Sequence, residues 1–178
     1  MGNFAHGKLD NSAERRLNAW KFAFVLAKNY PATGGGFEVF TPELFEKYVP
    51  GLEFAGPHSC YFQMMGEHGF VGFGLFLTLL ISCWLSLRRL HRIARLVPSL
   101  EWMTPYTQML QVSLLGFMVS GAFLACAYFD LFYQLCAGVV ILKIFSKKEL
   151  QTLLLQQEQE QIEAITHEHD SELAPSLA

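Results

Sequence analysis

Residues 70–87 read FVGFGLFLTLLISCWLSL, an apolar segment of 18 residues without a formal charge. A helix of that length rises about 27 Å, close to the thickness of the hydrocarbon core of a bilayer. The residues that follow it at once include Arg88, Arg89, His91, Arg92 and Arg95. A basic cluster of this kind is typical of the cytoplasmic end of a membrane span. The segment therefore predicts a transmembrane helix whose carboxyl end lies in the cytoplasm.

The composition of the whole chain also favours a membrane protein. Of its 178 residues, 52% are hydrophobic and only 16% are charged, whereas soluble globular proteins carry about 25% charged residues. The net charge of −3 and the lack of a basic stripe with interleaved aromatic residues argue against binding to nucleic acid. Residues 1–20 are polar and contain no apolar core, so they do not form a cleavable signal peptide.

Two more apolar segments predict further spans. Residues 109–129 contain small residues that would let helices approach closely, and residues 131–145 form a shorter run. Asp130 separates the two runs and is expected to mark a turn at the membrane surface, because a carboxylate inside the bilayer is costly. Lys147 and Lys148 follow the third run as a second basic cluster. Three helices in alternating directions place both clusters on the cytoplasmic side.

This topology predicts an all-α, multi-pass integral membrane protein with residues 1–69 outside the cytoplasm, which in a Gram-negative cell means the periplasm. A periplasmic region of helices and loops would occupy residues 1–69, and about three transmembrane helices would occupy residues 70–146. The Gln- and Glu-rich residues 147–178 would form a cytoplasmic tail, helical at first and disordered from Asp170 onward.

Helix and loop signals divide the periplasmic region. Ser12 is expected to cap a helix over residues 14–28, where apolar residues recur every three or four positions. Three consecutive glycines at 34–36 predict a loop that allows close backbone approach. Thr41 precedes a proline and a glutamate, a pattern that predicts a short helix over residues 42–48.

Three polar side chains in this region are candidates for chemistry. Arg16 could grip a phosphate or pyrophosphate, although an arginine on a helix surface has the same spacing. His58 could act as a general base near neutral pH, and its simpler alternative is a histidine at a helix start. Glu67 could orient His58 or bind a sugar hydroxyl. On one continuous helix, however, it would lie about 13 Å from His58 on the opposite face, and the adjacent His68 would face elsewhere.

No cofactor or metal ion is expected. The triple glycine is not followed by the Gly-Lys-Ser/Thr of a Walker motif, so it is weak evidence for phosphate binding. The four cysteines show no metal-ligand spacing and are interpreted as small apolar side chains.

The motifs together resemble those of a known family. Residues 12–20 match the Ser-x-x-x-Arg-x-x-x-Trp signature of the O-antigen ligase and O-antigen polymerase superfamily, and residues 31–36 match its Pro-x-x-Gly-x-Gly loop. The string HSCYFQ at 58–63 and the Glu-His-Gly at 67–69 match the two elements that follow in that family. Within it, residues 10–146 most resemble the O-glycosylation ligases associated with exosortase A systems.

This resemblance implies a glycosyltransferase of the ligase type with a polytopic fold. Such an enzyme moves a glycan from undecaprenyl pyrophosphate to an acceptor hydroxyl on a lipid, protein or polysaccharide, at the periplasmic face of the inner membrane and without a metal ion. Arg16 matches the motif arginine that would hold the pyrophosphate, and His58 matches the motif histidine proposed as the general base. Supporting roles would fall to Arg15, Gly34, Gly36 and Glu67.

The resemblance leaves two alternatives open. The same motifs occur in polymerases of O-antigen or exopolysaccharide, and the sequence does not separate ligation from polymerisation. A non-catalytic membrane scaffold, whose tail recruits a partner, is a further alternative. Because family members carry more membrane helices before these motifs, the chain is expected to be the C-terminal part of a ligase, with the remaining helices as a possible partner chain.

Overall fold

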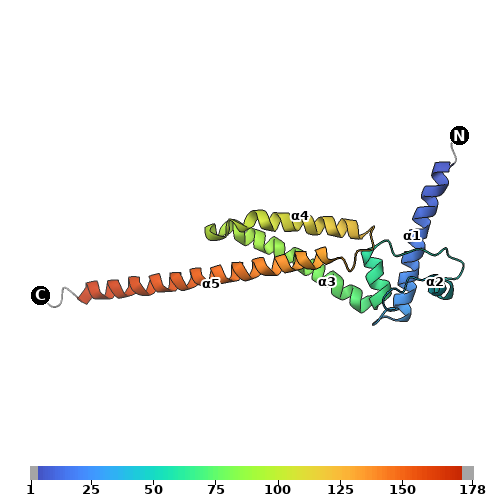
Figure 1. Ribbon diagram of the computed structural model, residues 1–178. Helices are drawn as coiled ribbons and strands as arrows, with labels where there is room; N and C mark the ends of the chain where they lie inside the picture. The colour runs from blue at the N-terminus through green and yellow to red at the C-terminus, as the bar shows by residue number, and fades with distance from the viewer. Residues whose placement is uncertain (1–3, 174–178) are drawn as a thin grey trace.

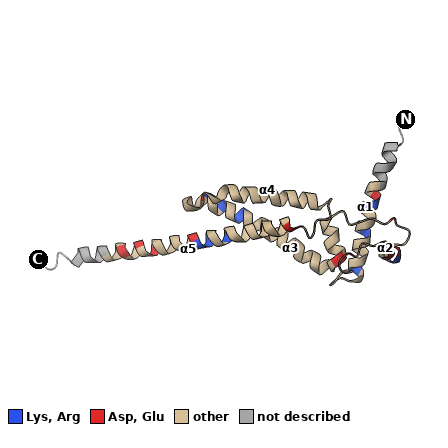
Figure 2. Ribbon diagram, viewed as in Figure 1, with Lys and Arg blue, Asp and Glu red and all other residues tan. Residues whose placement is uncertain are grey.

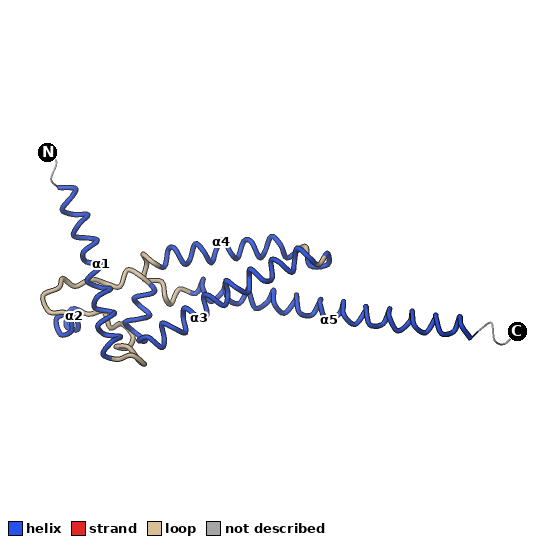
Figure 3. Tube along the Cα trace, turned by 180° about the vertical axis from the view of Figure 1, so that it is seen from behind, coloured by secondary structure: helices blue, strands red, loops and turns tan. Residues whose placement is uncertain are grey.

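The computed structural model describes the backbone of residues 4–173 and the side chains of residues 12–166. In that part of the chain every regular element is a helix and no strand occurs, so the all-helical prediction is confirmed (Figure 3). The elements in chain order are α1 (Phe4–Asn29), α2 (Pro42–Tyr48), α3 (Cys60–Leu96), the short 3-10 helix η1 (Pro98–Leu100), α4 (Met103–Gly121) and α5 (Asp130–Leu173).

The helices form two regions. From Gly69 onward α3 packs with α4 and with the first half of α5, and we call this region the bundle (Figure 1). Residues 12–69, which contain α1, α2 and the first turns of α3, gather at the opposite end from η1, and we call them the cap. The C-terminal half of α5 extends past the bundle without a neighbouring helix.

The cap contains its own apolar core. Phe22 of α1 stacks on Phe45 of α2, with ring centroids 4.2 Å apart, and Leu26 is buried beside them. The short helix α2 begins and ends where predicted, because Thr41 Oγ1 accepts a hydrogen bond from the Leu44 amide at 3.4 Å. This core fixes the end of α1 against the loops that carry the candidate residues.

The predicted start of α1 is wrong. Ser12 lies inside the helix, which already begins at Phe4, rather than capping it. No proline stands between these two residues, and an exposed serine is tolerated within a helix, so nothing in this stretch breaks it. At the other end, α1 stops at Asn29, two residues before Pro31, as the sequence predicts.

The bundle is centred on stacked aromatic rings. Phe132 of α5 is fully buried and lies parallel to Phe117 of α4, with centroids 5.0 Å apart, and it also contacts Phe76 of α3. A hydrogen bond from Tyr61 Oη to the Met118 carbonyl, 2.9 Å long, joins α3 to the end of α4. Phe76, Phe117 and Phe132 thus bring the three helices of the bundle into contact at one level.

The structure agrees with the three predicted membrane spans to different extents. Among the described residues, α3 alone is long and apolar enough to cross a membrane by length and composition. The second segment, expected at 109–129, is helical only to Gly121, and residues 122–129 form a loop instead. The third helix does begin beside Asp130, but it continues through the tail to Leu173, since no proline or glycine interrupts it after Gly138. Residues 174–178 of the expected disordered tail lie outside the described part.

Candidate functional site

The centre of the cap is a break in α3. Gly69 has φ 65° and ψ −166°, a conformation that is essentially restricted to glycine. At this break the amides of Phe70 and Val71 donate to the Pro31 carbonyl, over 2.8 and 3.3 Å. A Cβ at Gly69 would lie 2.5 Å from the same carbonyl oxygen, so the loop after α1 can approach only because this residue has no side chain.

The glycine loop docks on the residues just before this break. The Gly35 amide donates to the Gly66 carbonyl at 2.9 Å, and the Gly36 amide donates to the Glu67 carbonyl at 3.0 Å. Gly34 is buried, and a Cβ there would lie 2.5 Å from the Glu67 carbonyl. The amides of Gly34 and Gly36 are thus engaged with the backbone, which gives both residues a structural role in shaping the cap.

The two neighbouring arginines of α1 have different surroundings. Arg15 reaches the loop before α3, where its Nε lies 3.3 Å from Glu53 Oε1 and its guanidinium donates to the Phe54 carbonyl. Arg16 is half-buried and makes no hydrogen bond or ion pair with any residue that the structure describes. Arg15 therefore serves the fold, and the guanidinium of Arg16 is the one available to an anion.

A stacked pair of rings joins the α1 motif to the start of α3. Trp20 lies one turn after Arg16 and stacks on Phe62, with centroids 4.7 Å apart and an interplanar angle of 7°. Trp20 Nε1 and Gln63 Oε1 are both buried and have no hydrogen-bond partner within the described residues. Two motif positions therefore present unpaired polar atoms in the same neighbourhood, although a buried polar atom is normally paired.

His58 lies in the loop directly before α3. Its side chain is exposed, and its backbone has φ 40°, a value that few residues other than glycine adopt. Ser59 follows as the cap residue of α3, and Phe62 lies in the first turn of that helix. Because Phe62 stacks on Trp20 and Arg15 reaches the Phe54 carbonyl, the segments that carry Arg16 and His58 lie next to each other, on two different elements.

Glu67 does not pair with His58. It is 3% exposed and accepts a hydrogen bond from Tyr128 Oη, in the loop between α4 and α5. The same phenol oxygen lies 2.8 Å from His68 Nε2. The expectation that His68 faces elsewhere is therefore wrong, because the Tyr128 hydroxyl lies between the two adjacent side chains and contacts both.

Burial raises the pKa of the Tyr128 phenol, and its hydrogen bond to Glu67 raises it further. The phenol therefore stays protonated and donates to the Glu67 carboxylate, which leaves its oxygen to accept from His68 Nε2. Phe37, which is 72% exposed, covers this group, with its ring centroid 4.9 Å from that of His68. Tyr128 was not recognised from the sequence, since its partners are about sixty positions away.

A comparison with known families adds to this geometry. A family model described as O-antigen ligase matches residues 1–77. Residues 1–77 therefore resemble an O-antigen ligase domain. The matched residues include the whole cap and the break at Gly69, so the domain's motifs coincide with the contacts that hold the cap together. The resemblance drawn from the motifs is confirmed at this level.

The O-antigen ligase domain and the long apolar helix α3 together indicate a membrane protein with ligase or glycosyltransferase-type activity. Lipid-linked glycans are the substrate class that this family implies. Neither a curated protein nor a solved structure matches the chain. Among the described residues no group of His, Cys, Asp and Glu side chains could hold a metal ion.

Proposed function

We propose that this O-antigen ligase domain transfers a glycan from undecaprenyl pyrophosphate to an acceptor hydroxyl at the periplasmic face of the bacterial inner membrane. The observation that supports the proposal is the Trp20–Phe62 stack, which packs the part of α1 that carries Arg16 against the start of α3, just after His58. Arg16 is the fixed cation that stabilises the leaving group, and His58 is the base that accepts the proton of the incoming hydroxyl.

The outer surface of the bundle supports a membrane position. Large apolar side chains point away from the bundle on all three helices, including Leu75 on α3, Val112 on α4 and Ile144 on α5, which are 68, 71 and 62% exposed. Water would disfavour so much exposed apolar surface, whereas lipid accommodates it. We therefore place α4 and the first half of α5 across the membrane beside α3.

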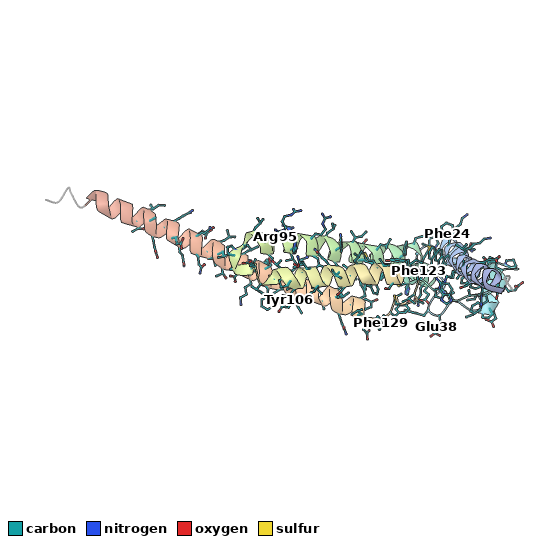
Figure 4. The ribbon with its side chains drawn as sticks, turned by 90° about the horizontal axis from the view of Figure 1, so that it is seen from above. Phe24, Glu38, Arg95, Tyr106, Phe123 and Phe129 are labelled. Atoms are coloured by element: carbon teal, nitrogen blue, oxygen red, sulfur yellow. The ribbon has the colours of Figure 1, made fainter. Side chains whose placement is uncertain are left out.

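The distribution of charge supports the orientation. The Lys and Arg residues of α3 and α5 gather at the end of the bundle far from the cap (Figure 2). Figure 4 shows Arg95 and Tyr106 at that end, and Phe24 and Phe123 at the cap end. By the positive-inside rule the basic end is cytoplasmic, so the cap faces the periplasm.

In the proposed reaction His58 accepts the proton of the acceptor hydroxyl as its oxygen forms a bond to the anomeric carbon of the glycan. The bond between that carbon and the pyrophosphate oxygen breaks with its electron pair on the phosphate. Arg16 stabilises this developing negative charge electrostatically, because a fixed cation needs no reorganisation when the charge forms.

The test replaces the two residues separately in the chain expressed from its native locus. We expect His58→Ala and Arg16→Ala each to lower glycan transfer about 100-fold or more, as measured from the glycosylated acceptor on a gel. Arg16→Lys should retain part of the activity, because a lysine keeps the charge but lacks the fork of donors.

Arg15→Gln is the matched control for Arg16. It removes a neighbouring guanidinium of the same helix that is already engaged with Glu53, so transfer should fall less than about three-fold. Membrane insertion is measured by resistance to alkaline extraction and should be the same for every variant. Near-normal transfer by both His58→Ala and Arg16→Ala would contradict the proposed chemistry.

A further inference from the structure

A groove of about 640 Å³ lies between α3 and α5 at the basic end of the bundle. Three cationic side chains line it: Arg89 from α3, and Lys143 and Lys147 from α5. Its described lining contains no acidic residue. The remaining walls are mainly apolar, with Leu85 on one helix and Ile144 on the other. Charge is therefore concentrated in the middle of the groove, with apolar side chains on either side of it along both helices.

We propose that this groove binds the headgroup and the upper acyl chains of an anionic phospholipid. The three cations would surround the phosphate, with the guanidinium of Arg89 offering paired donors and the two lysines acting as point charges. The apolar walls would contact the first methylenes of the chains. Basic pockets between transmembrane helices on the cytoplasmic side are suited to such headgroups.

The position of the groove favours a lipid over a soluble anion. It opens on the side of the bundle, where exposed side chains such as Leu85 and Ile144 continue the apolar surface. The phosphates of the inner leaflet lie at the depth where a membrane helix meets the cytoplasm. A free phosphate would make the same ion pairs but would leave the apolar walls without a partner.

The groove is separate from the proposed catalytic residues. It lies at the end of the bundle far from the cap, so the lipid-linked donor on the periplasmic side would not occupy it (Figure 2). The inference rests on the membrane placement given under the proposed function, but not on the reaction. A bound anionic lipid would neutralise Arg89 of α3 and the two lysines of α5, whose like charges repel each other, and would so hold the two helices together.

The experiment measures lipids retained by the full chain after purification in a mild detergent, by native mass spectrometry. The probes are phosphatidylglycerol and phosphatidylcholine with identical acyl chains. We expect wild-type protein to retain phosphatidylglycerol at least about ten-fold better than phosphatidylcholine. The combined variant Arg89→Gln, Lys143→Gln and Lys147→Gln should lose this preference.

A second triple variant provides the matched control. Arg88, Arg92 and Arg95 lie on the same end of α3 but line a different surface with Trp84 and Gln111. Replacing these three arginines by glutamine removes the same net charge and should leave the preference for phosphatidylglycerol within about two-fold of wild type. Equal losses in the two triple variants would mean diffuse attraction and would overturn the proposal.

Soluble competitors separate a lipid site from a phosphate site. Inorganic phosphate and glycerol phosphate at millimolar concentration should not displace bound phosphatidylglycerol, because they lack the acyl contacts. Complete displacement by either competitor, or equal retention of the two lipids by wild-type protein, would overturn the assignment. None of these readouts uses glycan transfer, so failure of His58 chemistry and failure of the lipid site are distinguishable.

Discussion

The bundle contains many more large aliphatic side chains than the cap, and the two regions use their apolar side chains differently. In the cap the large side chains such as Phe22 and Phe45 lie inside, and the backbone of the glycine loop is hydrogen-bonded to α3. In the bundle Phe132 is buried while Leu75 and Val112 face outward. Hydropathy therefore says less about the core of the bundle, where many of the most apolar positions face outward, than about the core of the cap.

The largest expected effect on stability compares a buried and an exposed position of α5 in the bundle. Phe132→Ala removes a fully buried ring from between Phe117 and Phe76, so it should lower the free energy of unfolding by about 3–5 kcal/mol. The adjacent Leu131 is 42% exposed, and Leu131→Ala should cost less than about 1 kcal/mol. Unfolding in mixed detergent micelles measures both. Equal costs would show that the two faces of α5 are not distinct.

The next effect tests the backbone contact that defines the cap. Gly69→Ala forces a side chain into a glycine-only conformation and against the Pro31 carbonyl, which should destabilise the cap by about 3 kcal/mol. Gly74→Ala is the control, because a Cβ there would meet nothing within 4 Å and alanine favours a helix. Limited proteolysis of the glycine loop should increase only in the first variant.

A smaller effect tests the contact between the cap and the bundle. Tyr128→Phe deletes the hydroxyl that donates to the buried Glu67 and accepts from His68, so the free energy of unfolding should fall by about 2 kcal/mol. Tyr133→Phe is the control, since its exposed hydroxyl makes only a 3.3 Å hydrogen bond to the Ala127 carbonyl. It should change stability by less than about 0.5 kcal/mol.

The pH dependence of that difference has a definite sign. The pKa of Tyr128 is raised by burial and by Glu67, so the folded state favours the protonated phenol. Its contribution is complete below the pKa of an unfolded tyrosine, about 10, and declines as pH rises through the higher folded value. The stability difference between wild type and Tyr128→Phe should therefore be constant from pH 7 to 9. A decline within that range would contradict the assigned proton.

The smallest effect concerns the exposed ion pair of the cap. Arg15 and Glu53 have side chains that are 48 and 56% exposed, so Arg15→Gln should cost less than about 1 kcal/mol, and less still in high salt. A thermal melt at two salt concentrations measures this. A cost above about 2 kcal/mol would indicate that the loop before His58 depends on Arg15 alone.

Local signals in the sequence predict the elements that depend on local chemistry. Thr41 and Pro42 define the start of α2, and Asp130 stands at the start of α5 as a favourable acidic residue. The break at Gly69 and the partner of Glu67 could not be predicted in this way. Both depend on segments about forty to sixty positions away, and a helical reading of residues 58–69 contains no sign of them.

The motif residues likewise combine roles that the sequence predicts with roles that only distant contacts reveal. The family pattern identifies Arg16 and His58 as candidates and matches Arg16 rather than Arg15, and the structure adds that Arg15 is engaged with Glu53 and Phe54. The motif glycines have roles that their pattern does not reveal, because the close approach at Gly34 involves α3 rather than an anion. The motif pattern thus identifies the region that contains the candidate site, and the packing contacts show which of its residues have a structural role.

The free half of α5 sets a length scale. From Leu155 to Leu173 the helix is continuous and projects beyond the part of α5 that lines the groove with α3 (Figure 1), and a helix of that extent rises about 28 Å. In the proposed orientation the basic end of the bundle lies at the cytoplasmic surface, and a partner docked near Ile165 would be held about 25 Å along the helix from Lys148. The tail therefore acts as a spacer whose reach could be shortened by about 5 Å for each helical turn removed.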